Sequence, residues 1–296
     1  MNRLLPTLLL TLCLALPGIS SGQQTPLLER DWQEISSPNF RIMSVLGQER
    51  TVELLRHLEI MRASLGDVSE ASTYQSDVPT VIIAVDNHDD YVSIGAPGFS
   101  AGYFISNLRE NAILIDDSDD AAGIQIVLHE YAHYLNKQSG RIRYPRWFEE
   151  GNAEYLSHSR VADHAFEFAL PPKPHLAALN FASWLPLRRI LEVADVTELS
   201  EANATLFYSQ SWLLVHYLRS LPDADLTLSK TLGRYSRLAS SGAAPVDAFE
   251  QAFGLDVAQV ERELLQYFLD GKFVTRRIPV NTTLPGFAIR SKDMSE

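Results

Sequence analysis

The sequence predicts an α+β fold, in which a sheet-containing N-terminal part is followed by a mainly helical C-terminal part. Short apolar and β-branched runs with strand-like alternation lie before about residue 117. After that point, apolar residues recur at helical spacing. The chain has 296 residues, of which 46% are hydrophobic and 21% charged, so it can bury a substantial core.

The N-terminal part is expected to contain alternating strands and a helix. Segment 40–45 alternates in polarity, whereas 49–65 repeats its apolar residues at helical spacing. Segment 80–85 is β-branched and stands between Pro79 and the turn residues Asp86-Asn87. The expected elements are a strand at 40–45, a helix at 49–65, a strand at 80–85, and a hairpin of 102–105 with 112–115.

The C-terminal part is expected to begin after a long amphipathic helix. That helix starts in the capping sequence Ser118-Asp119-Asp120 and ends near Gly140. A second helix follows Pro145 and runs to about Ser157. Further helices are expected near 206–220, 226–238 and 257–269, a loop or subdomain boundary at 171–174, and a loosely ordered tail at 276–296. The predicted parts are therefore 23–140, 141–275 and 276–296.

Residues 1–22 have the layout of a secretory signal peptide. A cationic start at Arg3 precedes the apolar run 4–16, and small residues at 20–22 suit cleavage before Gln23. The alternative is a membrane anchor, but a run of about 13 residues is shorter than the roughly 20 that a spanning helix needs. We expect an exported protein, either periplasmic or secreted, with no membrane span in its mature chain.

Charge and cysteine content exclude several classes of function. The formal net charge of −12 argues against nucleic acid as the main partner, because such proteins need a basic surface. Cys13 is the only cysteine and lies in the segment expected to be removed. The mature chain would then lack disulfides and thiolate ligands, so histidines and carboxylates must hold any metal.

The motif His129-Glu130-Tyr131-Ala132-His133 is the strongest functional signal. Residues four apart lie on the same face of a helix, so both imidazoles can reach one metal ion. Glu130 projects from the adjacent face, where it can act on the water in the open position of a zinc site. The alternative is an exposed helix that carries two histidines and an acid by chance.

Three features of the surrounding sequence favour the metal site over chance. The motif lies inside an amphipathic helix, and that helix follows a predicted hairpin strand. A further carboxylate arrives soon afterwards in Pro145-Arg146-Trp147-Phe148-Glu149-Glu150-Gly151-Asn152-Ala153-Glu154-Tyr155. The combination resembles the gluzincin zinc metallopeptidases, in particular the small peptidase-MA-like families, from about Gly102 to Leu218.

The resemblance implies roles for three more residues. Glu150, immediately before the glycine, would be the third zinc ligand, although Glu149 is a competing candidate that would point about 100° away on a helix. Glu154 would accept a hydrogen bond from a ligand histidine; the alternative is a surface glutamate. Tyr208 would donate its phenol to the developing oxyanion, or it is an amphipathic boundary residue.

The other histidines carry weaker signals. His216 is a rival donor to Tyr208, but a buried structural role fits it better. His88, in Asp86-Asn87-His88-Asp89-Asp90, reads as a solvated turn that starts a helix rather than as a second metal loop. The remaining ones have no partner pattern: His57, His158, His164 and His175.

We therefore predict a zinc-dependent peptidase that uses metal-activated water on peptide or protein substrates. The segment Gly98-Phe99-Ser100-Ala101-Gly102 lacks the substrate-amine motif of the aminopeptidase branch, so the resemblance favours an endopeptidase. Two alternatives are a non-catalytic zinc-binding protein on the same fold and a zinc hydrolase of non-peptide amides or esters. The intact Glu130 argues against a non-catalytic scaffold.

Overall fold

The computed structural model describes residues 26–66, 80–106, 111–138, 142–280 and 290–293. The chain divides into two compact units, Met1–Arg30 and Asp31–Glu296. In the first unit the described residues form the short 3-10 helix η1 (Leu27–Glu29). The expected signal peptide, residues 1–22, lies outside the described residues. The site and all the elements below belong to the second unit.

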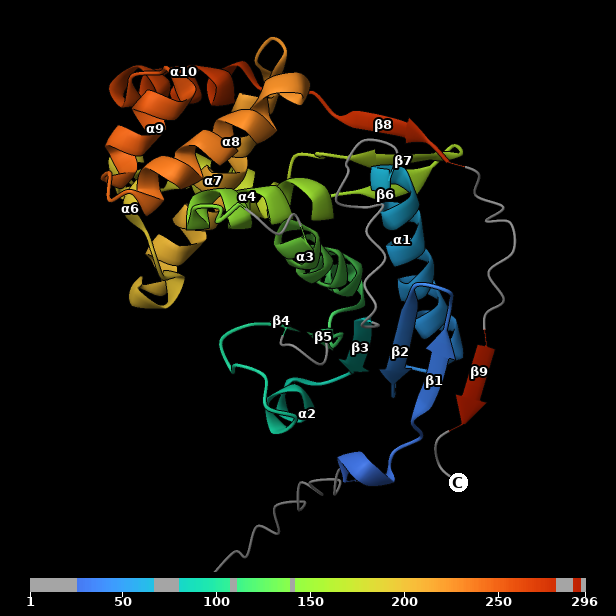
Figure 1. The fold of residues 1–296 in the computed structure, drawn as a ribbon. Coiled ribbons are helices and arrows are strands. Elements are labelled where there is room, and N and C mark those ends of the chain that lie inside the picture. Colours follow the sequence, from blue (N-terminus) through green and yellow to red (C-terminus); the bar gives the residue numbers. More distant parts are fainter. Residues whose placement is uncertain (1–25, 67–79, 107–110, 139–141, 281–289, 294–296) are drawn as a thin grey trace, which may run out of the picture. The chain divides into compact units, whose positions relative to one another are not determined.

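A mixed sheet forms the N-terminal half of this unit (Figure 1). In the part of the chain that the structure describes, six strands pair in the order β4-β5-β3-β2-β1-β9. Strand β3 is parallel to both β2 and β5, and the other neighbours are antiparallel. The strands are β1 (Gln33–Ser36), β2 (Phe40–Ser44), β3 (Thr80–Val85), β4 (Gly102–Ser106), β5 (Asn111–Asp116) and β9 (Arg290–Asp293).

A row of isoleucines across the sheet shows why these segments are strands. Ile35 pairs with Ile42, Ile42 with Ile82, and Ile82 with Ile113, and all four are fully buried. Because side chains alternate between the two faces of a strand, this register places one apolar row against the helices. The sheet therefore provides a rigid support for the elements that carry the candidate site.

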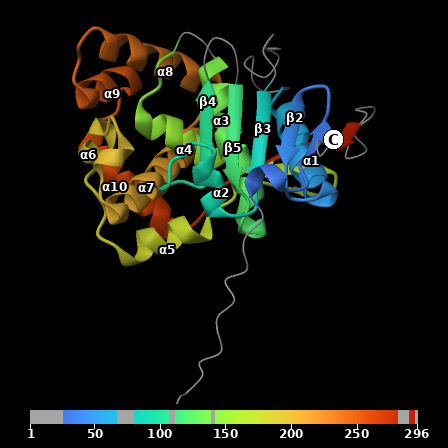
Figure 2. The same cartoon turned by 90° about the horizontal axis from the view of Figure 1, so that it is seen from below.

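Two long helices pack side by side on the sheet. Helix α1 (Gln48–Gly66) contacts β1 and β2, and α3 (Asp120–Gln138) contacts β4, β5 and α1. Figure 2 shows β4 at one edge of the sheet, next to α3. The short α2 (His88–Ser93) follows β3. The predicted α+β class is confirmed, as are the helix at 49–65, the strands at 40–45 and 80–85, and the pairing of the hairpin strands. The helix expected from Ser118 to near Gly140 is confirmed over Asp120–Gln138, and its expected end lies outside the described residues.

The C-terminal half is mainly helical, as predicted, with α4 packed between α3 and α7. The predicted second helix corresponds to α4, and those near 206–220, 226–238 and 257–269 correspond to α7, α8 and α10. The helices are α4 (Arg146–Ser157), α5 (Lys173–Phe181), α6 (Leu187–Glu192), η3 (Val196–Glu198), α7 (Glu201–Ser220), α8 (Ala224–Ser240), α9 (Pro245–Phe253) and α10 (Val257–Asp270).

Four short strands differ from the sequence-based expectation. Strands β6 (Arg160–Ala162) and β7 (Ala165–Phe168) form a hairpin inside the predicted helical part. Strand β8 (Arg276–Pro279) pairs with β7, and β9 extends the large sheet, so these parts of the expected loose tail are ordered strands. Strands β8 and β9 are held by backbone pairing with strands that are far away in the sequence, and local periodicity does not reveal such pairing.

The proline-rich segment 171–174 also differs from the expected loop. Pro172 is the N-cap of α5, and Pro174 lies in its first turn. Proline suits that position because the first helical N–H groups have no partner inside the helix. The prolines therefore start a helix, and that helix carries His175.

None of the described helices combines the length and the apolar character that crossing a membrane requires.

Candidate metal centre

Two neighbouring helices carry the residues that the motif singled out. His129 and His133 lie one turn apart on α3, and Glu150 lies on α4, which packs against α3. Gly151 permits a close approach of α4 to α7, because a Cβ atom there would lie 2.3 Å from the Ser211 carbonyl oxygen. Helix α7 therefore holds α4 on the side opposite α3, and Glu150 faces α3.

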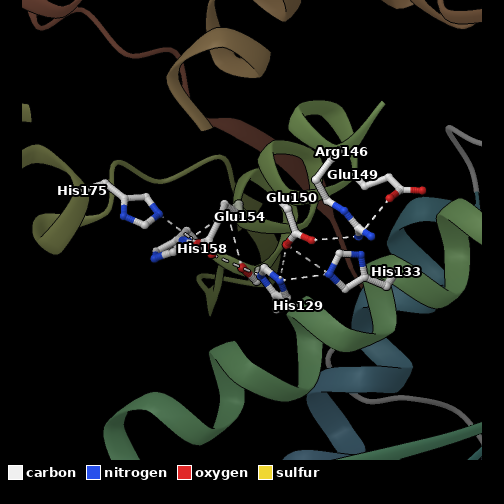
Figure 3. A network of polar contacts seen from close by, with 9 residues as sticks. His129, His133, Arg146, Glu149, Glu150, Glu154, His158 and His175 are labelled. Carbon is white, nitrogen blue, oxygen red and sulfur yellow. Dashed lines mark hydrogen bonds and ion pairs between the residues drawn. The ribbon is translucent and has the colours of Figure 1, made fainter. Parts of the chain in front are cut away.

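The three side chains converge on one point (Figure 3). The Nε2 atoms of His129 and His133 are 3.1 Å apart, and Oε2 of Glu150 lies 3.4 Å from each of them. Metal–ligand bonds of about 2.0–2.2 Å at tetrahedral angles would separate neighbouring ligand atoms by about 3.3–3.6 Å. The observed spacings come close to this range, with the imidazole pair slightly tighter. These residues can therefore hold a metal ion.

Glu150, rather than Glu149, is the carboxylate at this point. Burial raises the pKa of Glu150, but hydrogen bonds from the two imidazoles outweigh burial and bring the pKa well below its usual value. Its second oxygen, Oε1, lies 3.3 Å from Arg146 Nη1. Glu149 is half-buried and pairs with the same arginine at 3.1 Å. The buried, ionised carboxylate of Glu150 is the form that a cation needs.

Glu154 lies one turn further along α4, behind His129. Its Oε1 is 3.3 Å from Nδ1 of His129, the ring nitrogen that points away from the other two ligands. Burial raises the pKa of Glu154, but the positive potential of His129 and His175 outweighs it, so the net pKa is well below the usual value. An ionised carboxylate here holds a proton on Nδ1 of His129, so Nε2 would be the nitrogen that gives up its proton to bind a metal.

Glu130 is buried between α3 and β4. A Cβ atom at Gly102 would lie 2.7 Å both from its Oε1 and from a methyl group of Ile126, so the glycine leaves room on β4 for these two side chains of α3. Burial raises the pKa of Glu130 even though His129 and His133 act in the opposite direction. The backbone of Phe104, on β4, also acts to lower this pKa, but burial outweighs it. Glu130 is thus held by β4, next to the two imidazoles.

Tyr208, on α7, lines the same cleft as these residues. The cleft has a volume of about 1860 Å³ and extends along β4, α3 and α4 to the segment around η3. Burial and then the negative charges of Glu150 and Glu154 raise the pKa of the Tyr208 phenol well above its usual value. The hydroxyl therefore keeps its proton and can act as a hydrogen-bond donor.

His216 and His88 lie apart from the metal centre. His216 is buried, at 2% exposure, and its ring lies 2.9 Å from the Tyr267 hydroxyl and 3.3 Å from the Ala169 carbonyl oxygen. Its predicted burial is confirmed. His88 is the first residue of α2, as predicted, and its Nδ1 lies 2.9 Å from Asp116 Oδ2.

His158 and His175 belong to the site although no pattern in the sequence indicated them. His175 Nε2 lies 3.1 Å from Glu154 Oε2, and His158 Nδ1 lies 2.9 Å from the Glu154 carbonyl oxygen. Figure 3 shows both rings next to Glu154, on the side away from His133. The only available signal was the four-residue spacing of Glu154 and His158 on one helix face. His175 is 21 residues from Glu154 and gave no such signal.

Comparisons with known proteins add no family assignment. No protein-family model matches the chain. A search of curated proteins also finds no match.

Proposed function

We propose that this protein is a zinc-dependent peptidase of the gluzincin type. The observation that carries the proposal is the convergence of two imidazole nitrogens and one carboxylate oxygen at 3.1, 3.4 and 3.4 Å, inside a cleft that also contains Glu130. Three protein ligands with a free fourth position are typical of catalytic zinc, whereas structural zinc sites are closed by four.

The ligand types favour zinc among the divalent metals. Two neutral imidazoles and one carboxylate suit zinc, while calcium and magnesium prefer oxygen ligands alone. When bound, zinc lowers the pKa of a water molecule to about 7 and polarises a carbonyl group. His129, His133 and Glu150 would hold the ion.

Glu130 and Tyr208 would carry out the proton transfer and the charge stabilisation. Glu130 would accept a proton from the attacking water and pass it to the leaving amine. Its buried position and raised pKa favour this role, because a proton that it accepts is retained long enough to be delivered. The protonated Tyr208 would donate a hydrogen bond to the oxygen on which negative charge develops.

The shape of the cleft favours a peptide substrate. Its volume of about 1860 Å³ exceeds the roughly 300–1,000 Å³ of a typical small-molecule site. Strand β4 lines it and is an edge strand of the sheet in the described part of the chain, so an extended peptide could pair with it. Together with the missing substrate-amine motif, these features favour an endopeptidase.

We propose an exported location, periplasmic or secreted, for this activity. The support is the signal-like sequence of residues 1–22 together with the absence of cysteine from residues 23–296. A zinc site without thiolate ligands is also resistant to thiol oxidation outside the cytosol.

Cleavage of a peptide library by the zinc-loaded wild type and by Glu130→Gln tests the proposal. Glutamine keeps the size of the side chain but cannot take a proton. We expect wild-type cleavage, zinc retained in both proteins, and a loss of about 10²–10⁴-fold in kcat for the variant. Zinc binding without cleavage of any peptide would indicate a non-catalytic protein, and cleavage of amides or esters alone would indicate a non-peptide hydrolase.

A further inference from the structure

We propose that His175 is a positioning residue of the metal centre, which holds the Glu154 carboxylate against His129. The inference rests on the proposed metal site and adds a residue from a third helix, α5, to those on α3 and α4. A chain of partly buried polar contacts runs from His129 through Glu154 and His175 to Ser209 on α7.

Each oxygen of Glu154 contacts a different imidazole. Oε1 lies 3.3 Å from Nδ1 of His129, and Oε2 lies 3.1 Å from Nε2 of His175. An ionised carboxylate can only accept hydrogen bonds, so both of these nitrogens must carry a proton. His175 therefore uses its Nε2–H to fix one end of the carboxylate while the other end accepts from His129.

The His175 ring is itself held at its opposite nitrogen. Its Nδ1 lies 3.2 Å from the Ser209 hydroxyl oxygen, which is fully buried and 2.7 Å from the Thr205 carbonyl oxygen. With a polar partner at each nitrogen, the imidazole cannot rotate without breaking its partly buried hydrogen bond to Glu154. The ring also lies against Trp212, with centroids 6.2 Å apart. His175 is thus a fixed donor rather than a mobile side chain.

His158 does not have the same role, although it is close by. Its Nδ1 is 2.9 Å from the Glu154 backbone carbonyl oxygen and 3.3 Å from Oε2. Its better-placed hydrogen bond therefore goes to the backbone of α4. His175, by contrast, contacts the Glu154 side chain and not the backbone of α4.

The consequence for metal binding follows from the geometry of the carboxylate. Without His175, Oε2 of Glu154 loses its nearest partner, at 3.1 Å, and the carboxylate can rotate away from His129 Nδ1. His129 is then less firmly held in the tautomer that presents Nε2 to the metal. Loss of outer contacts of this kind weakens metal binding by about 10–100-fold.

A matched pair of substitutions, His175→Gln and His175→Met, tests the inference. The two side chains have similar length and volume, but only glutamine offers an N–H donor to Glu154. Zinc affinity is measured by competition with a chromogenic chelator, after circular dichroism has shown that each metal-free protein is folded. We expect Met to weaken zinc binding about tenfold or more, and Gln to stay within about threefold of wild type. His57→Ala, on α1 and bonded to the Glu53 carbonyl oxygen, is the control and should match wild type.

A double-mutant cycle separates positioning from a general structural effect. If His175 acts through Glu154, His175→Met should change zinc affinity little in a Glu154→Gln background. Equal losses in both backgrounds would overturn the inference, as would wild-type affinity in His175→Met or equal losses for Met and Gln. Wild type that binds zinc but cleaves no peptide would contradict only the proposed function, because the affinity comparison would still decide the role of His175. Wild type that binds no zinc would contradict both.

Discussion

At the scale of single residues, His216 shows how burial sets the charge of a side chain. Burial lowers its pKa to about 4, against a usual value of 6.5, and outweighs the backbone hydrogen bond to Ala169 that favours the proton. The ring is therefore neutral in the folded protein at pH 7 and packs among aromatic side chains, including Trp212 and Tyr267.

This burial predicts a pH dependence of stability that can be assigned to His216. Between pH 6.5 and about 4 the unfolded chain binds a proton at this histidine and the folded chain does not, so stability falls as the pH falls. At pH 4.5 the free energy of unfolding should be lower than at pH 7 by about 2–3 kcal/mol from this residue. Urea unfolding of wild type and His216→Gln at both pH values measures it. The variant should lack this part of the loss, and equal losses in both proteins would contradict the assignment.

The residues of the candidate site differ in how far the sequence reveals them. His129 and His133 follow from helical spacing alone, because both ligands belong to one helix. The roles of Glu150 and Glu154 could be predicted only from the resemblance to a family, because no local sequence pattern shows that α4 packs on α3. The structure brings Glu150 to the two imidazoles and Glu154 to His129. His175 could not be predicted, because its contact to Glu154 exists only after α5 has packed against α7.

At the scale of elements, the packing of α4 on α7 decides where Glu150 points. Gly151 lies at the closest approach, where a Cβ atom would meet the Ser211 carbonyl oxygen at 2.3 Å and a methyl group of Val215 at 2.9 Å. A backbone atom cannot move aside as a flexible side chain can. Any larger residue must therefore push α4 away from α7 and shift Glu150 with it.

Gly151→Ala is predicted to destabilise the protein and weaken metal binding. The expected loss is about 1–3 kcal/mol in the free energy of unfolding, as for other overpacked cores. Gly233→Ala on α8 is the matched control, because its Cβ atom would meet neighbours only at 3.6 Å and beyond. That change should be neutral or stabilise by up to about 1 kcal/mol, since alanine favours helix. Thermal and urea unfolding measure the stability of both variants. A Gly151→Ala variant as stable as the wild type would show that the contact between α4 and α7 is not tight.

The elements that the sequence predicted are those with long, regular patterns. Strand β3 and helices α1 and α3 carry apolar repeats over their full length. The hairpin of β6 and β7 has strands of three and four residues joined by Asp163-His164, both with positive φ. Glycine, asparagine and aspartate dominate turns of this conformation, and His164 stands where the common Asp-Gly pair has its glycine, so the usual turn signal is missing. Such short strands depend on tertiary pairing.

At the scale of the whole molecule, a bound metal would join two halves of the fold. Helix α3 packs on the sheet, whereas α4 packs on the helical α7. A metal held by His129, His133 and Glu150 therefore cross-links the α+β part to the helical part. A metal that binds the folded state but not the unfolded state stabilises the fold, by an amount that depends on the concentration of free metal.

Removal of the metal is predicted to lower the thermal stability of the wild type. With free zinc about a thousandfold above Kd, binding contributes about 4 kcal/mol, which corresponds to a change of several degrees in Tm. Differential scanning calorimetry with zinc and with a chelator measures the shift. Glu150→Gln, which loses the anionic ligand, should show a much smaller difference. An identical shift in that variant would place the metal elsewhere.

X-ray absorption at the zinc edge, on protein loaded with one equivalent of zinc, identifies the ligands of the metal. Zinc held by His129, His133 and Glu150 should show two imidazoles and oxygen ligands at about 2.0–2.2 Å, with one imidazole lost in His133→Ala. A wild type that retains no zinc would contradict this metal site, and so would a ligand shell that His133→Ala leaves unchanged.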